Sequence, residues 1–353
     1  LFKTVDQGNN WKAISPDLTA NPDERSSAIV SVCESPVEPG VVWAGTNDGN
    51  VYLTKDDGVN WTLLNANITG APQFYWVKRI EASHHAAGRA YIALDGHRYE
   101  DWAPYIYVTE DFGATWKNIS NNLPEGSIYV VREDLKNPDL LFAGSEFSLH
   151  YSLDRGMTWS RFMTGFPTVP VHDLVIHPRD GDLIAATHGR GAWIADNITP
   201  LQQLTADVKE EDVHLFDVRP EVQWERTYEW TWVPEKRFYK PNPPTGSTIA
   251  YYLRRDIPDS VTIEILDITG EVIWNFDGPP TAGISKVFWN FRKNPPPRTD
   301  MQPGQFGQQM RGRGGRSASP AEPGEYLVRL TAGGTILTTK LIIEKDNPGN
   351  LGK

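Results

Sequence analysis

Short segments in which apolar and polar residues alternate, or in which apolar residues run together, fill residues 28–194. They are four to eight residues long and rich in Val, Ile, Leu, Tyr and Trp, which favours β-strands over helices. Turn residues separate them into three groups of four and a last group of three, without an evident fourth strand. The expected strands are 28–35, 41–46, 50–54 and 61–64; 77–83, 89–94, 105–109 and 116–119; 128–132, 140–144, 149–152 and 159–162; and 169–176, 182–187 and 191–194.

One eight-residue motif, Ser/Thr-x-Asp-x-Gly-x-x-Trp, occurs four times. In each complete group it joins the third strand to the fourth. Its fixed positions are Asp6, Gly8 and Trp11; Asp56, Gly58 and Trp61; Asp111, Gly113 and Trp116; and Asp154, Gly156 and Trp159. The aspartates are 50, 55 and 43 residues apart. A strand-and-turn repeat of this period is typical of a β-propeller with one motif per blade.

The residue types of the motif indicate a structural role. An Asp side chain accepts hydrogen bonds from turn amides, and a Gly adopts the positive φ that closes a hairpin. The Trp is expected to cover its turn and to bury a large apolar area. Aspartates repeated in surface turns also suit calcium binding or catalysis, but each of these stands alone, with no second carboxylate at a fixed offset. We therefore interpret them as turn-building residues.

The repeats predict an incomplete ring. Propellers typically have about four to eight blades, whereas residues 1–197 supply three whole groups and parts of two others, about four blades in all. The sequence lacks an initiator Met, and residues 1–4 already form the strand before the first motif. We expect residues 1–197 to be the C-terminal part of a larger propeller, whose missing blades come from upstream residues or from another chain.

A different pattern follows residue 197. Residues 198–244 are expected to be a linker and docking segment, with one or two helical turns at 198–205 and a proline-rich end. Residues 245–346 again show short alternating strands, which predicts an immunoglobulin-like β-sandwich. Its longest interruption, 294–323, is expected to be a flexible Gly/Pro/Arg loop. The predicted fold class is therefore all-β, a partial propeller followed by a sandwich.

Composition narrows the functional classes. A net charge of −11 and a pI of about 5.2 give no basis for a general nucleic-acid role. The single cysteine, Cys33, cannot form an internal disulfide. No apolar segment approaches the ~20 residues of a membrane span. The histidines form no metal constellation, and no phosphate-binding loop or catalytic triad pattern is present. We expect neither a metal nor a cofactor.

Candidate ligand residues lie on the turns that join second strands to third strands. Antiparallel order places these turns on the rim opposite the Asp motifs. Their length and charge vary from blade to blade, as a recognition surface requires. The predicted ligand-binding residues are His97, Arg98, Glu146, His188 and Arg190.

The chemistry of this rim leaves two alternatives open. Asp48, Asp95 and Glu146 come from successive blades and are weak candidates for the two carboxylates of a glycoside hydrolase, which lie about 5 Å or about 6.5–9.5 Å apart. They are otherwise solvated loop tips. His188 and Arg190 suit an anionic ligand, or they pair with acidic tips and hold the last blade in the ring. Binding without catalysis is the leading hypothesis.

The repeated motif resembles the Asp-box (BNR) repeat of sialidases, xyloglucan-cleaving glycosidases and sortilin/VPS10-type receptor propellers. Segments 104–109, 141–146, 182–193 and 198–201 are similar to secreted bacterial proteins often labelled "glycosyl hydrolase". Residues 261–272, 289–292 and 323–330 resemble the Ig-like module that ends such proteins, and hook-capping or secretion-tail domains. The resemblance implies a secreted, periplasmic or cell-surface protein that binds a protein or carbohydrate ligand. The resemblance concerns architecture, because fold does not imply function.

Overall fold

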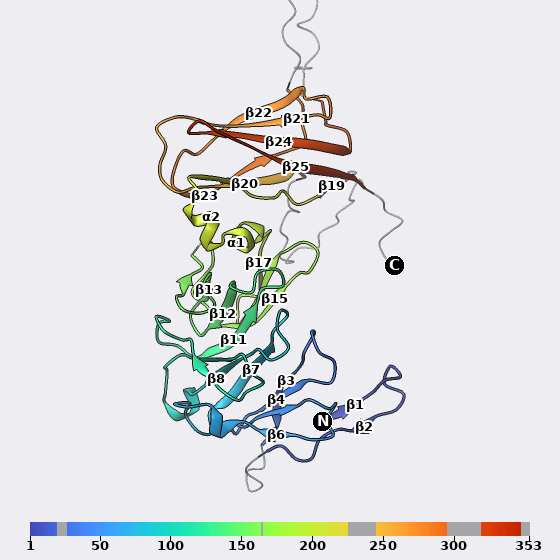
Figure 1. The fold of residues 1–353 in the computed structure, drawn as a ribbon, viewed down its shortest axis with the longest axis vertical. Coiled ribbons are helices and arrows are strands. Elements are labelled where there is room, and N and C mark those ends of the chain that lie inside the picture. Colours follow the sequence, from blue (N-terminus) through green and yellow to red (C-terminus); the bar gives the residue numbers. More distant parts are fainter. Residues whose placement is uncertain (20–26, 164, 225–244, 295–318, 347–353) are drawn as a thin grey trace, which may run out of the picture. The chain divides into compact units, whose positions relative to one another are not determined.

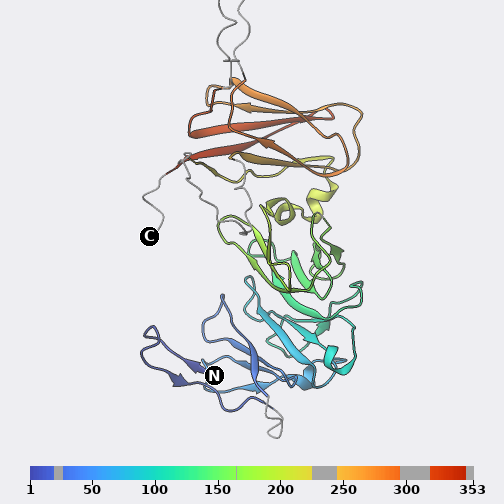
Figure 2. The same cartoon turned by 180° about the vertical axis from the view of Figure 1, so that it is seen from behind.

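The computed structural model describes residues 1–19, 27–163, 165–224, 245–294 and 319–346. Almost all of the regular structure is β, and the chain divides into two compact units, residues 1–202 and 203–353 (Figures 1 and 2). In these described ranges no helix is long and apolar enough to cross a membrane.

Three antiparallel four-stranded sheets form the middle of the first unit, and each is one complete blade. They are β3 (Ile29–Glu34), β4 (Val42–Thr46), β5 (Val51–Thr54) and β6 (Thr62–Leu63); β7 (Trp76–Ala82), β8 (Ala90–Asp95), β9 (Tyr105–Thr109) and β10 (Lys117–Asn118); and β11 (Ile128–Glu133), β12 (Leu141–Ser145), β13 (Leu149–Ser152) and β14 (Ser160–Arg161). Short 3-10 helices lie at Asn65–Asn67 and His97–Tyr99.

Two incomplete sheets flank the three blades. β1 (Phe2–Lys3) and β2 (Lys12–Ala13) form a two-stranded sheet, and β15 (Val171–Ile176), β16 (Leu183–Thr187) and β17 (Ala192–Ala195) form a three-stranded one. The prediction of an all-β fold with a partial propeller is confirmed.

Successive sheets of the first unit pack through shared apolar clusters. The first strands β3, β7, β11 and β15 contact one another in this order. The middle strand β8 is buried at all six residues, because neighbouring sheets cover both of its faces. One cluster joins Tyr91 of β8 to Val131 of β11 and Leu141 of β12. This two-sided burial explains why the second strands are apolar runs rather than alternating segments.

The four Asp motifs fold into the same turn. One carboxylate oxygen accepts hydrogen bonds from the Ser or Thr hydroxyl two residues earlier, at 2.7–2.8 Å, and from the backbone N–H four residues later, at 2.8–2.9 Å. The second oxygen accepts from the side chain of that later residue at 2.6–2.7 Å. These bonds to the residue four positions later lower the pKa of Asp6, Asp56 and Asp111. Each carboxylate is thus engaged within its own turn.

The expectation that each motif tryptophan is buried beside its own turn was wrong: Trp61 and Trp159 contact the preceding sheet, and Trp11, whose indole N–H donates to Gly8 of its own turn at 3.1 Å, is exposed. The indole N–H of Trp61 donates to the carbonyl of Ile14 at 2.7 Å, and that of Trp159 donates to Ile119 at 2.7 Å. Trp159 is 5% exposed, whereas Trp11 is 61% exposed. Within the described residues, the motif of Trp11 has no preceding sheet, so the apolar surface that would bury its indole is absent there.

The second unit consists of two sheets around one core. One sheet has the order β18 (Val213–Leu215), β20 (Ser247–Leu253), β23 (Gly283–Trp289). The other has the order β19 (Glu221–Gln223), β25 (Thr335–Lys345), β24 (Gly324–Ala332), β21 (Val261–Leu266), β22 (Val272–Gly278). Trp289, Tyr251 and Ile263 are fully buried in the shared core.

The stretch 198–244, expected as a linker, contributes to regular structure. It contains α1 (Thr199–Gln203), α2 (Ala206–Glu210) and the strands β18 and β19 of the second unit. Val213 and Leu215 of β18 belong to the core of that unit, which is why this segment is ordered with the sandwich. Residues 225–244, and residues 295–318 of the predicted Gly/Pro/Arg loop, lie outside the described ranges.

Replacing Trp159 with Ala should lower the free energy of unfolding by about 3–5 kcal/mol, because it removes a large buried side chain and its hydrogen bond to the preceding sheet. The matched change Trp11→Ala, at a side chain that is 61% exposed, should cost under ~1 kcal/mol. Denaturant unfolding of both variants measures the difference. Equal losses would contradict burial by the preceding sheet.

The free energy of unfolding should also fall on acidification because of His150, which is 3% exposed on β13. Burial, and secondarily the charge of Arg161, lowers the pKa of its imidazole from 6.5 to about 4. Between those values the unfolded chain binds the proton and the folded chain does not, so stability falls by about 3 kcal/mol as pH drops through this window. His150→Gln should lack this part of the slope in unfolding measured from pH 7 to 4; equal slopes would contradict it.

Candidate functional site

In the first unit, a β-bulge occurs at the same place in the first strand of each of the four sheets that have three or four strands. The register shifts at Ile29/Ser31, Val77/Arg79, Ile128/Val130 and Val171/Asp173. The extra residues are therefore Val30, Lys78, Tyr129 and His172. Because a bulge leaves one residue unpaired and redirects its side chain, each sheet presents one such residue near the start of its first strand.

These strand starts lie on the rim that the sequence analysis selected. The register pairs Trp76 of β7 with Asp95 of β8, Ile128 of β11 with Ser145 of β12, and Val171 with Thr187. The turns after Asp95, Ser145 and Thr187 carry the predicted ligand residues, so the bulges and these turns share one end of the sheets. The Asp motifs lie at the other end.

Three successive sheets contribute to a continuous row of aromatic and cationic side chains, which we call the rim array: Trp76, Lys78, Tyr129, His172 and His188. The Lys78 ammonium lies 4.1 Å from the Trp76 ring centroid and 5.0 Å from that of Tyr129. Tyr129 stacks on His172 with centroids 4.5 Å apart, and His172 lies 5.6 Å from His188. The row thus connects β7, β11 and β15 to the turn after β16.

Asp95 and Arg98 flank one end of the rim array. The buried carboxylate of Asp95 accepts a hydrogen bond from the backbone N–H of His97 at 3.1 Å, and the same oxygen lies 2.7 Å from Nδ1 of the His97 ring. Lys78 Nζ lies 3.9 Å from its other oxygen. The guanidinium of Arg98 lies 4.4 Å from the Trp76 ring centroid. Trp76 is therefore in contact with two cations.

Two carboxylates influence the centre of the array. Burial raises the pKa of Tyr129 to about 12, and the charges of Glu146 and Asp95 contribute to the same shift. Burial also lowers the pKa of His172, with help from Lys78 and His188. One oxygen of Asp95 and one of Glu146 are buried without a hydrogen bond among the described residues. Such oxygens favour a ligand that brings hydrogen-bond donors.

The remaining predicted residues are placed differently. Asp48, which is 8% exposed, accepts a hydrogen bond from the hydroxyl of Thr46 within its own turn. Its sheet presents Val30 at the bulge, so the row of aromatic and charged bulge residues does not extend to that blade. Arg190 is exposed beside His188, and its carbonyl accepts the indole N–H of Trp193 at 3.2 Å.

Trp76, Lys78, Tyr129 and His172 were not among the residues predicted from sequence. Their signal is weak: each is a polar or aromatic residue near the start of a predicted first strand, where an apolar residue is the ordinary choice. The β-bulges bring these side chains to the rim beside the turns, and no residue type in the sequence predicts a bulge at these positions.

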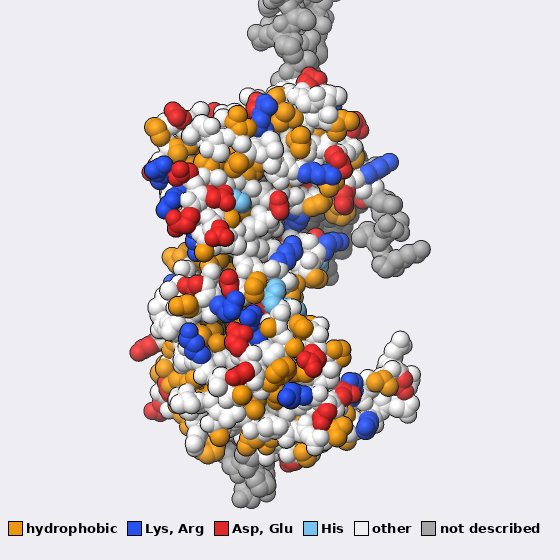
Figure 3. Space-filling view, viewed as in Figure 1, with side chains coloured by type: hydrophobic (Ala, Val, Ile, Leu, Met, Phe, Trp, Pro, Cys, Tyr) orange, Lys and Arg blue, Asp and Glu red, His pale blue; other side chains and the backbone are white. Residues whose placement is uncertain are grey.

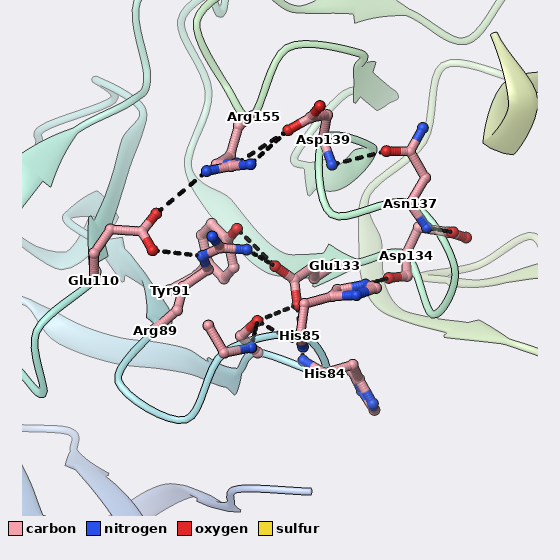
Figure 4. A network of polar contacts seen from close by, with 12 residues as sticks. His84, His85, Arg89, Tyr91, Glu110, Glu133, Asp134, Asn137, Asp139 and Arg155 are labelled. Carbon is pink, nitrogen blue, oxygen red and sulfur yellow. Dashed lines mark hydrogen bonds and ion pairs between the residues drawn. The ribbon is translucent and has the colours of Figure 1, made fainter. Parts of the chain in front are cut away.

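A second polar cluster joins the blades β7–β10 and β11–β14 on the side of the Asp motifs (Figure 4). Glu133 is fully buried, and its two oxygens accept hydrogen bonds from Tyr91 at 3.0 Å, Arg89 at 3.1 Å and Ser83 at 2.6 Å. Arg89 continues to Glu110 at 2.7 Å. Because both oxygens of Glu133 are satisfied by the protein, we interpret this cluster as a structural link between blades.

Charge on the molecular surface is mixed. On the face in Figure 3, acidic and basic side chains are interspersed with exposed hydrophobic ones over both units. Within the described ranges, no group of three or more His, Cys, Asp and Glu side chains is arranged to hold a metal ion.

A family model described as sortilin, neurotensin receptor 3 (Sortilin-Vps10) matches residues 104–224 of the 353. No curated protein sequence matches the chain. Together with the four Asp motifs, the family match supports a propeller of the BNR/Vps10 type for the first unit.

Several solved structures are similar in fold. YCF48 from Cyanidioschyzon merolae is 18% identical over 47% of this chain and 53% of its own, with a TM-score of 0.34. A GH74 xyloglucanase from Xanthomonas campestris is 15% identical over 72% of this chain and 39% of its own, with a TM-score of 0.43. A GH74 enzyme from Niastella koreensis is 12% identical over 96% of this chain and 53% of its own, with a TM-score of 0.45. This chain thus spans about half or less of each, and the likeness concerns the fold alone.

Removing Glu133 should test the structural interpretation of the second cluster. Glu133→Ala should lower the free energy of unfolding by about 3–5 kcal/mol, because it removes the buried acceptor of Ser83 and Tyr91 and leaves Arg89 with the half-exposed Glu110 alone. The control Glu110→Ala, whose side chain is 50% exposed, should cost under ~1 kcal/mol. Denaturant unfolding measures both. A stable Glu133→Ala variant would show that the carboxylate is not a link between blades.

Proposed function

We propose that this protein binds a protein or glycan ligand on the rim that carries the rim array. The observation that carries the proposal is the convergence of Trp76, Lys78, Tyr129, His172 and His188 from three successive sheets. The fold does not require aromatic or charged side chains at these bulges, because the β3–β6 sheet forms the same bulge with Val30.

The chemistry of the array favours a ligand with hydrogen-bond donors and flat or apolar faces. Aromatic rings and cations supply stacking and charge. The buried oxygens of Asp95 and Glu146 that have no hydrogen bond within the described ranges would pair with hydroxyl or amide groups, which both sugars and peptides carry. The turns of this rim also vary from sheet to sheet, whereas the Asp-motif turns use their polar groups internally.

The proposal extends to the setting of this rim. We propose that further strands and blades complete the ring, that the second unit is an Ig-like module, and that the protein acts as a secreted, periplasmic or cell-surface protein of bacterial type. The exposed Phe2 and Trp11 on the β1–β2 sheet, 68% and 61% accessible, support completion by other strands. The resemblance of the repeats to secreted Asp-box proteins supports the location.

A glycoside hydrolase is the second candidate function. Asp95 and Glu146, from neighbouring blades, both raise the pKa of Tyr129, so two carboxylates act on one region of the rim. Hydrolysis of a glycosidic bond uses two carboxyl groups that face one sugar. Asp48 is a poorer partner because its carboxylate is held by Thr46.

Binding is tested with three immobilised probes: xyloglucan, polygalacturonate and a tryptic peptide pool. Replacing both Lys78 and His188 with Ala should weaken retention on the bound probe by about tenfold or more, as removal of central contacts does. The control Lys117→Ala, at an exposed strand residue on β10, should retain wild-type binding. Absence of binding to all three probes, or equal loss in the control, would contradict the rim as the ligand site.

The two candidate functions differ in product formation. If the protein only binds, reducing ends should not accumulate when it is incubated with either polysaccharide, and Asp95→Asn should change affinity alone. Accumulation of reducing ends that Asp95→Asn and Glu146→Gln each abolish, with folding intact by circular dichroism, would establish the hydrolase in place of a binding protein.

A further inference from the structure

Among the described residues, no strand pairs with the outer edge of β17, where the three complete blades have their fourth strand. In those blades the third strand pairs with a two-residue fourth strand; Tyr151 and His150 of β13, for example, pair with Ser160 and Arg161. The register of β16 with β17 makes Trp193 and Ile194 the equivalents of His150 and Tyr151. His150 is 3% exposed, whereas Trp193 is 37% and Ile194 58% exposed.

An apolar recess lies beside this edge. Leu149 and Phe162 line it from the preceding blade, Leu183 and Ala185 line it from β16, and Trp193 and Ile194 line it from β17. The recess continues the core between these two sheets, because Leu149, Leu183 and Ala185 are members of that core and Phe162 packs against it.

The same place in the preceding blade is filled by a motif tryptophan. Trp159 shares its cluster with Ile106 and Ile119 of the preceding sheet and with Leu141 and Ala143 of its own sheet. Strand pairing makes these four residues the equivalents of Leu149, Phe162, Leu183 and Ala185, in that order. The recess is therefore the position of the tryptophan that opens a fourth strand.

The backbone acceptors for such a strand follow from the same equivalence. Trp159 donates its indole N–H to the carbonyl of Ile119, whose equivalent at the recess is Phe162. The residue three positions after the motif Trp donates its backbone N–H to the third strand: Leu64 to Val51 at 2.9 Å, Ile119 to Ile106 at 2.9 Å, and Phe162 to Leu149 at 2.8 Å. The equivalent acceptor on β17 is the carbonyl of Ala192.

All four fourth-strand segments of this chain share one sequence pattern. They are 11–14 (WKAI), 61–64 (WTLL), 116–119 (WKNI) and 159–162 (WSRF). Each has Trp first and Leu, Ile or Phe fourth. The Trp fills the space between blades, and the fourth residue closes the edge of the sheet: Leu64 is 3% and Ile119 2% exposed.

We propose that the edge of β17 and the adjacent recess form a docking site for an extended polypeptide segment of sequence Trp-x-x-Leu/Ile/Phe, supplied by a partner and added antiparallel as the fourth strand. Its indole enters the recess and donates to the carbonyl of Phe162, and its fourth residue donates to Ala192. Strand addition of this kind combines main-chain hydrogen bonds with a side-chain pocket that gives specificity. The inference deepens the proposal that further strands complete the ring and is independent of ligand binding on the rim.

The probe is a capped peptide with the sequence of residues 113–120 (GATWKNIS), measured against the full chain by calorimetry or fluorescence anisotropy. The same peptide carrying Trp116→Ala should bind at least tenfold more weakly, because it loses the side chain that fills the recess. A peptide N-methylated at Ile119 should also lose at least tenfold, since it cannot donate to Ala192. Equal affinities for the three peptides would overturn the proposal.

Protein variants locate the site. Ile194→Asp, at a side chain that is 58% exposed in the recess, should weaken the peptide at least tenfold without unfolding the blade. Ile268→Asp, a matched change at a side chain that is 85% exposed in the second unit, should leave affinity unchanged. Retained affinity in Ile194→Asp would overturn the site.

The two proposals fail separately. Loss of peptide binding in Ile194→Asp with normal retention on the polysaccharide or peptide-pool probe supports strand docking and leaves the rim intact. The variant with both Lys78 and His188 replaced should bind the 113–120 peptide as wild type does. If that variant also loses the 113–120 peptide, the peptide binds at the rim, and strand docking at β17 is overturned.

Discussion

The first unit depends on the packing of fourth-strand tryptophans, namely Trp61, Trp116 and Trp159, against the preceding sheet. Trp61 and Trp159 each donate across the blade boundary at 2.7 Å. The indole also fills the apolar space between two sheets, as the cluster around Trp159 shows. Isolated four-stranded sheets bury little apolar surface. The contact between neighbouring sheets buries more, and it holds the successive blades together in one unit.

The turn formed by the Asp motif positions this tryptophan at the start of the fourth strand. Its carboxylate satisfies backbone and side-chain donors within the turn, and two consecutive residues adopt positive φ, such as Phe112 and Gly113. The equivalent Gly58 leaves no room for a larger residue, because an added Cβ would lie 2.4 Å from the backbone carbonyl oxygen of Ile14 beside the preceding sheet. The glycine is thus required both by its conformation and by the closeness of the neighbouring sheet.

The two ends of the propeller sheets carry different side-chain chemistry. On the Asp-motif side, many polar groups pair within turns or between blades, as Glu133 does, although Glu81 Oε1 and Trp116 Nε1 are buried without a hydrogen bond among the described residues. On the opposite side the bulges place Lys78, Tyr129 and His172 in contact, and buried carboxylate oxygens of Asp95 and Glu146 have no hydrogen bond among the described residues. An arrangement that leaves polar atoms unsatisfied is costly for folding alone. Because such atoms occur on both sides, the proposed binding role of the bulge side is supported by the convergence of aromatic and charged side chains there.

The sequence by itself determined the repeat, the turn and the strand order, because these depend on residue types at short, fixed spacing. It also identified the rim turns, since antiparallel order alone places Asp95, Glu146 and His188 at one end. Tertiary structure decided the rest. The burial of a motif tryptophan depends on the preceding blade, so Trp11 and Trp159 share a motif but differ from 61% to 5% exposure. The rim array depends on β-bulges, which arise from the register between strands and leave no mark in the residues that they redirect.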